Sequence, residues 1–495
     1  MNNKRTNLLS LNDYCLEVIF ENLDLLEQIR LSLCHPRLEW VFVHMIVPHL
    51  DRNFCFDDAH AFTEWDFRQL FYTVGKCMEI IILGPKFQRN ASHLEGIYSY
   101  MQECRLRVKH IIIHSREPKQ CVSLLSSLQP DYISELDLFE CNLCDNDLQY
   151  LCKLRNLKAL GLGWNYQIEG IVLKDLHNLQ RLMLCCCDSI TNEALTECCK
   201  NLRLKFLDIR MFNNLSHVET AVQHCTSLET LKTTSLNVDA AKLPNLRSLE
   251  IRHQNSQWAS RFYEALLKFH QHDLLELKLF DEIYVFFPTA ARFAQFKKLR
   301  TLALGKNAFS VCRDVVKLIS GLTDLEEIHL INSLRIRDKH LLPFITKCTK
   351  LKRVDIRMCR YISNNFVWKT MIILKRRAAN SKEIFNRQPL TILVNGTRIT
   401  RNILDSVGYK RNSDLLKLLF HNSNTQLSVI FKTENHKSDC SCFSCRKSNK
   451  SNPNEMRGEM SEEYGNLSDD DEDDDDDDGV DIDEHDLEST LISME

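Results

Sequence analysis

One short apolar pattern recurs along half of the chain and restricts its fold more than any other sequence feature. An apolar residue is followed by two other residues, an apolar residue, any residue and a further apolar residue, as in residues 157–162. The copies lie 18 to 28 residues apart, with a mean spacing of 24.3 residues. Their first members are Val108, Ile133, Leu157, Leu179, Leu204, Leu228, Leu246, Leu274, Leu299, Leu325 and Leu351.

A unit with this pattern cannot bury its apolar residues alone. Leu160 and Leu162 alternate, so both side chains point to one face of a strand. In a later unit, Ile190, Ala194 and Cys198 fall on one stripe of a helix. Neighbouring units must therefore stack. A unit of one strand and one helix resembles a leucine-rich repeat, whose period is about 20–29 residues. The sequence thus predicts an α/β solenoid with a curved parallel sheet and outer helices.

Residues 8–52 precede the repeats and predict three short amphipathic helices. Asn12 can cap the first helix, with Asp13 in its first turn. Three short helices form a core too small to be comfortably stable, so we expect part of their apolar surface to meet a partner or the repeats. The three apolar stripes are Leu16, Ile19, Phe20 and Leu23, then Leu26, Ile29 and Leu33, and finally Leu38, Val41, Phe42 and Met45.

Two stretches resemble members of one family. The segment 185–195, CCCDSITNEAL, with Cys198 and Cys199 after it, resembles the cysteine-containing repeats of F-box/leucine-rich-repeat proteins. The segment 11–42 resembles the F-box itself, the motif by which substrate receptors attach to the Skp adaptor of cullin-based ubiquitin ligases. This sequence has Asn12 where the family usually has proline. The adaptor-binding residues that the resemblance implies are Leu11, Leu16, Ile19, Phe20, Leu23, Leu26 and Ile29.

The resemblance implies a substrate-recognition subunit of an SCF-type ubiquitin ligase. Its partners would be the Skp adaptor, through it a cullin, and an unknown protein substrate. We expect no catalytic residue and no cofactor, because there is no glycine-rich phosphate loop and no nucleophile with a recognisable signature. Two alternatives remain open. The three helices can instead cap the solenoid, and the chain can be a leucine-rich-repeat scaffold with no connection to a ligase.

Residues that alternate with the buried leucines face outward from the strands. Arginine and aromatic residues are frequent anchors of protein interfaces. We predict that one cationic and aromatic group binds the substrate, with an acidic or phosphorylated segment as its ligand. Asp208, Glu250 and Glu276 lie among these residues, so a solvated surface of ion pairs is the alternative. The predicted group is Phe206, Arg210, Lys232, Arg252, Lys278 and Phe280.

The net charge of −4 conceals an asymmetry along the chain. Residues 455–495 hold 20 acidic residues and one basic residue, so residues 1–454 carry a net charge of +15. All residues from 469 to 478 are acidic. Such a block repels itself, and we expect this tail to be disordered. It can serve solubility, or it can bind the basic body of the chain or a basic partner.

Four possible metal ligands precede the tail, namely His436, Cys440, Cys442 and Cys445. Their spacing is not that of the paired C-x2-C zinc knuckle. We therefore predict free thiols and no metal site. For the basic residues Lys369, 375–377 and Lys382, we favour a solvated helix face over contact with nucleic acid.

The chain contains 21 cysteines, and its first twenty residues carry Asp13 and Glu17 where an apolar signal core would run. No apolar run approaches the 18 or so residues of a membrane span. We expect a reducing compartment, the cytoplasm or the nucleus, with cysteine as a small buried hydrophobe. The predicted segments are an F-box at 8–52, a linker and cap or first irregular repeat at 53–105, about 11–12 repeats at 106–410, a cap and polar linker at 411–454, and an acidic tail at 455–495.

Overall fold

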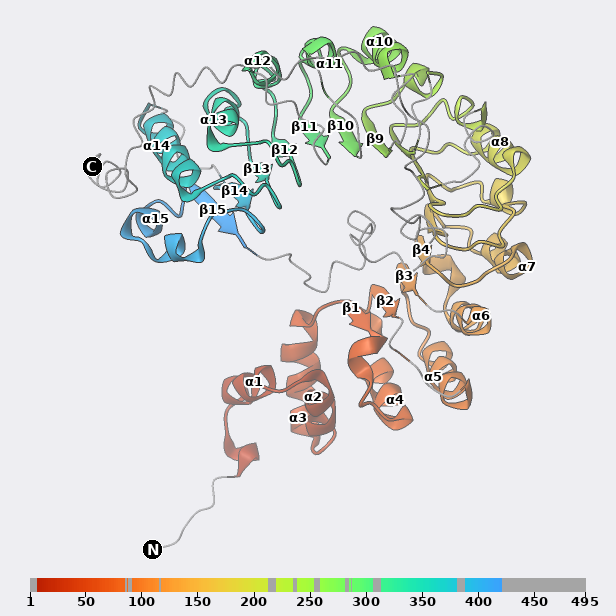
Figure 1. Ribbon diagram of the computed structural model, residues 1–495. Helices are drawn as coiled ribbons and strands as arrows, with labels where there is room; N and C mark the ends of the chain where they lie inside the picture. The colour runs from red at the N-terminus through yellow and green to blue at the C-terminus, as the bar shows by residue number, and fades with distance from the viewer. Residues whose placement is uncertain are drawn as a thin grey trace, which may run out of the picture. The chain divides into compact units, whose positions relative to one another are not determined.

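The computed structural model in Figure 1 describes residues 7–84, 87, 91–114, 117–211, 220–234, 238–252, 259–280, 285, 287–305, 313–380 and 388–420. The chain divides into two compact units, Met1–Asp281 and Glu282–Glu495. In each unit the strands pair in parallel, follow one another in chain order, and carry helices on one side. The prediction of an α/β repeat solenoid is confirmed. Among the described residues, no helix is long and apolar enough to cross a membrane.

The first unit stacks repeats through columns of leucine. Leu136, Leu160, Leu182 and Leu207 are register partners on successive strands, and all of them are fully buried. Burying one such side chain contributes about 1.5–3 kcal/mol, so the column favours this register strongly. The described strands are β1 (Asn53–Cys55), β2 (Ile80–Leu83), β3 (His110–Ile113), β4 (Glu135–Leu138), β5 (Ala159–Gly161), β6 (Arg181–Met183), β7 (Phe206–Ile209), β8 (Thr230–Thr233), β9 (Ser248–Arg252) and β10 (Glu276–Phe280).

The helical half of each repeat varies with its length. The shortest interval, from Leu228 to Leu246, has room only for the 3₁₀ turn Ala240–Lys242. Similar turns occur at Gln149–Lys153 and Leu173–Asp175. The α-helices of the described repeats in this unit are α4 (Glu64–Thr73), α5 (Ala91–Glu103), α6 (Pro118–Ser127), α7 (Asp145–Leu148), α8 (Asn192–Asn201) and α10 (Ala259–His270).

The second unit continues the same repeat. Its described strands are β11 (Thr301–Leu304), β12 (Glu327–His329), β13 (Arg353–Asp355), β14 (Leu390–Leu393) and β15 (Leu416–Leu419). Its described helices are α11 (Phe287–Phe293), α12 (Arg313–Ile319), α13 (Asp338–Lys347), α14 (Asn364–Asn380) and α15 (Val407–Arg411). The strand series therefore spans residues 53–419 rather than 106–410. The pattern ends early in the sequence because Pro389 of the β14 repeat occupies the place of the first apolar residue.

Cysteine and asparagine side chains tie neighbouring repeats together. The Cys187 thiol donates to the Leu162 carbonyl at 3.0 Å, and the Cys359 thiol donates to the Leu330 carbonyl at 2.9 Å. Asn165 donates to the Leu138 carbonyl at 2.7 Å. These groups satisfy buried backbone acceptors where each strand turns away from the sheet. Burial raises the pKa of the Cys187 and Cys359 thiols to about 12, so both stay neutral. Most described cysteines of the repeats are buried, as predicted, whereas Cys144 is half-buried and Cys152 is exposed.

The N-terminal module folds as three short helices, as predicted. They are α1 (Asp13–Glu21), α2 (Leu25–Ser32) and α3 (Pro36–Val41), which continues into a π-helical turn at Phe42–Ile46. Asn12 caps α1 by accepting from the Cys15 amide at 2.8 Å. The Phe20 ring is fully buried and stacks on Phe42 at 5.6 Å between ring centroids. The module therefore has a closed core of its own.

The acidic tail, the group from His436 to Cys445, and Lys382 lie outside the described residues. Lys369 and residues 375–377 lie on α14, where Lys369 and Lys375 are half-buried and Arg376 is exposed. Within the described part of the chain, no group of His, Cys, Asp and Glu is arranged to hold a metal ion.

Candidate functional site

Four large apolar side chains of the N-terminal module remain exposed after it folds. Tyr14 is 74% exposed, Val18 56%, Trp40 49% and Leu33 36%. Tyr14 and Val18 are neighbours one turn apart on α1. Trp40 stacks on His44 at 4.8 Å and still presents half of its surface to solvent. We call these four residues the exposed apolar set.

The exposed apolar set differs from the adaptor-binding residues implied by the sequence. Leu16, Phe20 and Ile29 form the module's own core and are at most 1% exposed, so they cannot contact a partner while the module is folded. Leu11, Ile19, Leu23 and Leu26 are half-buried and stay accessible in part. On α1 the stripe at i, i+3, i+4 and i+7 faces inward, because an isolated module must first close its own core. Tyr14 and Val18 lie on the opposite side of that helix and could have been found from this period.

A buried carboxylate joins the module to the first repeat. Arg30 of α2 donates two hydrogen bonds to Asp66 of α4, at 3.0 and 2.9 Å. Asp66 also accepts from the Thr63 amide and hydroxyl, which completes the capping box of α4. Burial raises the pKa of Asp66, but Arg30 and Thr63 outweigh that effect and hold it at about 2. The Asp66 carboxylate is therefore charged, and both of its oxygens accept hydrogen bonds.

Replacing Asp66 by alanine is expected to lower the free energy of unfolding by about 2–4 kcal/mol, because the cap of α4 and the bidentate Arg30 contact are lost together. Urea denaturation followed by circular dichroism measures the change. The exposed Asp58 provides a control, since Asp58→Ala should change stability by less than about 0.5 kcal/mol. Equal effects of the two substitutions would show that this link contributes little.

The predicted substrate residues are brought together on β7 to β10. Asp208, Lys232, Glu250 and Lys278 are successive register partners, and Arg252 pairs with Phe280. The alternation in the sequence therefore identified the columns correctly.

Arg210 differs from the prediction, because it is only 3% exposed. Its guanidinium donates to Asp208 at 2.9 and 2.7 Å and to Glu250 at 2.6 Å. It is a buried structural charge rather than a surface cation.

Glu250 is the centre of the charged strand face. Besides Arg210, its carboxylate pairs with Lys232 at 3.1 Å and with Arg252 at 3.4 Å. Burial raises the pKa of Glu250, but the charges of these three cations hold it at about 2. Burial also lowers the pKa of Arg210, yet Asp208 and Glu250 keep it above the ordinary value. The alternative interpretation, mixed ion pairs on the strands, therefore describes much of this face.

Aromatic rings occupy the remaining space beside these cations. The Arg181 guanidinium lies 4.3 Å from the centre of the Phe206 ring, and the Arg252 guanidinium lies 5.1 Å from that of Phe280. Arg181 is exposed, whereas Phe206 and Phe280 are half-buried. This arrangement can hold an acidic or planar group of a partner at the strand surface.

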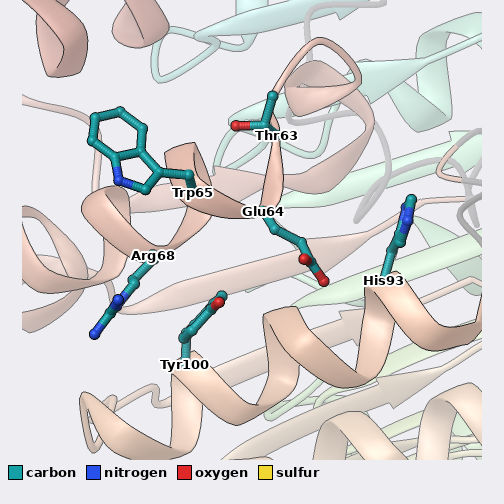
Figure 2. A pocket seen from close by; sticks show the side chains of 6 residues that line it. All are labelled: Thr63, Glu64, Trp65, Arg68, His93 and Tyr100. Carbon is teal, nitrogen blue, oxygen red and sulfur yellow. The ribbon is translucent and has the colours of Figure 1, made fainter.

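A separate hollow of about 480 Å³ lies between α4 and α5. Figure 2 shows Trp65 and Arg68 on one side, Glu64 and His93 on the other, and Tyr100 between them. The Arg68 guanidinium lies 5.6 Å from the Tyr100 ring centre. The hollow thus combines a cation, a carboxylate and two aromatic rings on the helical side of the first unit.

Comparison with known proteins found similar chains among the solved structures alone. No protein-family model matches the sequence, and no curated protein matches it. A chain of the yeast complex of Rad7 and Elc1 is similar with a TM-score of 0.46 and 15% identity, over 84% of this chain and 99% of that one. An internalin from Listeria monocytogenes is similar with a TM-score of 0.31 and 18% identity, over 56% of this chain and 80% of that one. TLR13 in its complex with ssRNA13 is similar with a TM-score of 0.30 and 12% identity, over 70% of this chain and 65% of that one.

The fold and the surfaces define the class of protein. The chain is an α/β solenoid of the leucine-rich-repeat type, with a three-helix module before its first strand.

Proposed function

We propose that the protein is the substrate-recognition subunit of an SCF-type ubiquitin ligase. The N-terminal module binds the Skp adaptor, and through it a cullin, while the repeats bind the protein to be ubiquitinated. The chain supplies no catalytic group in this role. It holds lysines of the substrate near a ubiquitin-charged enzyme, so that proximity accelerates the transfer. The proposal places this work in the cytoplasm or the nucleus.

The exposed apolar set is the observation that carries the proposal. A closed module has no internal use for Tyr14, Val18, Leu33 and Trp40, which lie within the segment 11–42 that resembles an F-box. Large apolar side chains exposed on a small folded module favour contact with another protein. Cover by an adaptor would remove them from water and contribute binding free energy.

On the substrate side, the proposal assigns binding to the strand face of β6 to β10. Arg181 and Lys278 are its most accessible cations, beside Phe206 and Phe280. Lys232 and Arg252 already form ion pairs with Glu250. The buried Arg210 also pairs with Glu250 and fixes its position. A substrate segment with carboxylate or phosphate groups fits this set of residues.

Val18→Asp tests the adaptor surface, because it places a charge among the exposed apolar residues without touching the core of the module. Retention of the purified Skp adaptor should fall at least tenfold, which corresponds to about 1.4 kcal/mol or more. Ile171→Asp is a matched control, since Ile171 and Val18 are both 56% exposed and Ile171 lies far along the chain in the β5–β6 repeat. This control should retain the adaptor fully.

Two outcomes contradict the proposal. If wild-type protein retains no adaptor, the chain is a leucine-rich-repeat scaffold that works outside the ligase. If Val18→Asp and Ile171→Asp retain equal amounts, the adaptor contacts another surface.

A further inference from the structure

Within the second unit, positive charge is concentrated in residues 282–420. Residues 1–281 contain 30 Lys and Arg against 35 Asp and Glu, a net charge of −5. Residues 282–420 contain 27 against 10, a net charge of +17. The acidic tail, residues 455–495, carries −19. The tail therefore nearly matches the charge of residues 282–420 in size and opposes it in sign.

Five arginines lie along one edge of the second unit, on the loops that follow its strands. Arg335 and Arg337 follow β12, Arg360 follows β13, and Arg398 and Arg401 follow β14. The loops are adjacent, because Arg337 and Tyr361 form a β-bridge and the Arg398 amide donates to the Ile362 carbonyl at 2.9 Å. All five side chains belong to exposed residues. We call them the arginine edge.

The carboxylates near the arginine edge are engaged elsewhere. Asp338 accepts from the Ser363 amide and hydroxyl at 3.0 and 2.6 Å, and Asp405 faces Lys410 at 3.7 Å. Within the described residues, none of the five arginines has a carboxylate within 4.0 Å.

On the opposite edge, two lysines are paired with carboxylates. Lys350 contacts Asp324 at 2.6 Å, and Lys352 contacts Glu326 at 2.6 Å. The arginine edge thus presents five exposed arginines that have no carboxylate within 4.0 Å among the described residues.

The described part of the second unit ends at this same edge. β15 is parallel to β14, so both strands end on the side where the arginine loops begin. Phe420 follows β15 directly, and the Arg401 guanidinium lies 5.9 Å from its ring centre. Residues 421–468, a segment of 48 residues, separate Phe420 from Asp469. A segment of that length reaches up to about 160 Å when fully extended, whereas neighbouring strands are about 4.8 Å apart, so its length allows residues 469–478 to reach the arginine loops.

We propose that the acidic block at residues 469–478 binds the arginine edge of its own chain. Guanidinium groups pair with carboxylates through two parallel hydrogen bonds, and an extended acidic segment offers a carboxylate about every 3.3 Å. The tail then occupies the edge until an acidic partner displaces it. The contact is a built-in competitor, and it does not depend on the adaptor.

A fluorescent peptide with the sequence of residues 466–480 tests the proposal through its anisotropy. The full-length protein is compared with a full-length variant in which Asn and Gln replace the acidic residues at 469–478. The peptide should bind the variant at least tenfold more tightly, because a tethered tail competes at an effective concentration on the order of 1 mM. Peptide binding should be abolished when the neutral-tail variant also carries Arg337→Gln, Arg360→Gln and Arg398→Gln. In the matched control, Lys298→Gln, Lys350→Gln and Lys352→Gln remove the same charge from the opposite edge and should preserve it.

Three results would overturn the proposal. The first is equal affinity of the peptide for the wild type and the neutral-tail variant, which means that the tail does not cover the edge. The second is an equal loss from the arginine and lysine triple variants, which means attraction to net charge alone. The third comes from a short DNA duplex as the probe. Binding to the wild type and the neutral-tail variant with equal affinity, lost in the arginine variant, would make the edge an open nucleic-acid site.

Discussion

Replacing Arg210 by methionine should lower the free energy of unfolding by about 3–5 kcal/mol, because it leaves buried carboxylates without their cation. Methionine fills most of the space of the arginine stem, so a cavity adds little. Asp208 and Glu250 are 2% and 3% exposed and cannot turn to water without opening the strand face. Urea denaturation of the full chain, followed by circular dichroism, measures the change.

Arg181→Met is the control for Arg210→Met. Arg181 lies on the neighbouring strand β6 over the Phe206 ring, but its residue is exposed. Its loss should cost less than about 1 kcal/mol. Similar effects of the two substitutions would show that the ion pairs of Arg210 contribute no more than a surface contact.

The same network predicts how stability depends on pH. The pKa of Glu250 is about 2 in the folded chain against an ordinary value of 4.5. A folded-state pKa below the unfolded one stabilises the fold above pH 4.5, and this stabilisation is lost as the pH falls toward 2. The contribution is on the order of 3 kcal/mol. In Arg210→Met the loss of stability between pH 4.5 and 2 should be smaller, because the cation that lowers the pKa of Glu250 is gone.

The repeat could be predicted from the sequence because each copy contains the apolar residues that determine its register with the next copy. The alternation at Leu160 and Leu162 defines one buried face, and the spacing aligns it with the next copy. The same alternation correctly placed Phe206, Lys232 and Lys278 at half-buried positions between the buried leucines. It could not show that Arg210 is buried. That burial depends on Glu250, which is 40 residues away and two strands further along the sheet.

The ends of the array were harder to predict for a related reason. β1 and β14 lack the first apolar residue of the pattern, and Pro389 replaces it in the β14 repeat. Their place in the sheet follows from the neighbouring strands that pair with them. In the N-terminal module, helical periodicity found the apolar residues but did not separate core from contact surface. Both roles need apolar side chains, and only packing distinguishes Phe20 from Val18.

Phe20→Ala should therefore act differently from Val18→Asp. The Phe20 ring is fully buried against Phe42, and its truncation should cost about 3–5 kcal/mol. Three short helices have little stability to lose. We expect the module to unfold locally, with a loss of hydrogen-exchange protection in α1 to α3 and of adaptor binding together.

Val18→Asp separates the two effects, because its side chain is already in water. Exchange protection in α1 to α3 should match the wild type while adaptor retention falls. The repeats provide an internal reference, since protection of β4 to β6 should be unchanged in both variants. If Phe20→Ala keeps full protection yet loses the adaptor, Phe20 itself touches the partner and the closed core described here is wrong. If Val18→Asp loses protection, the exposed face of α1 supports the fold rather than an interface.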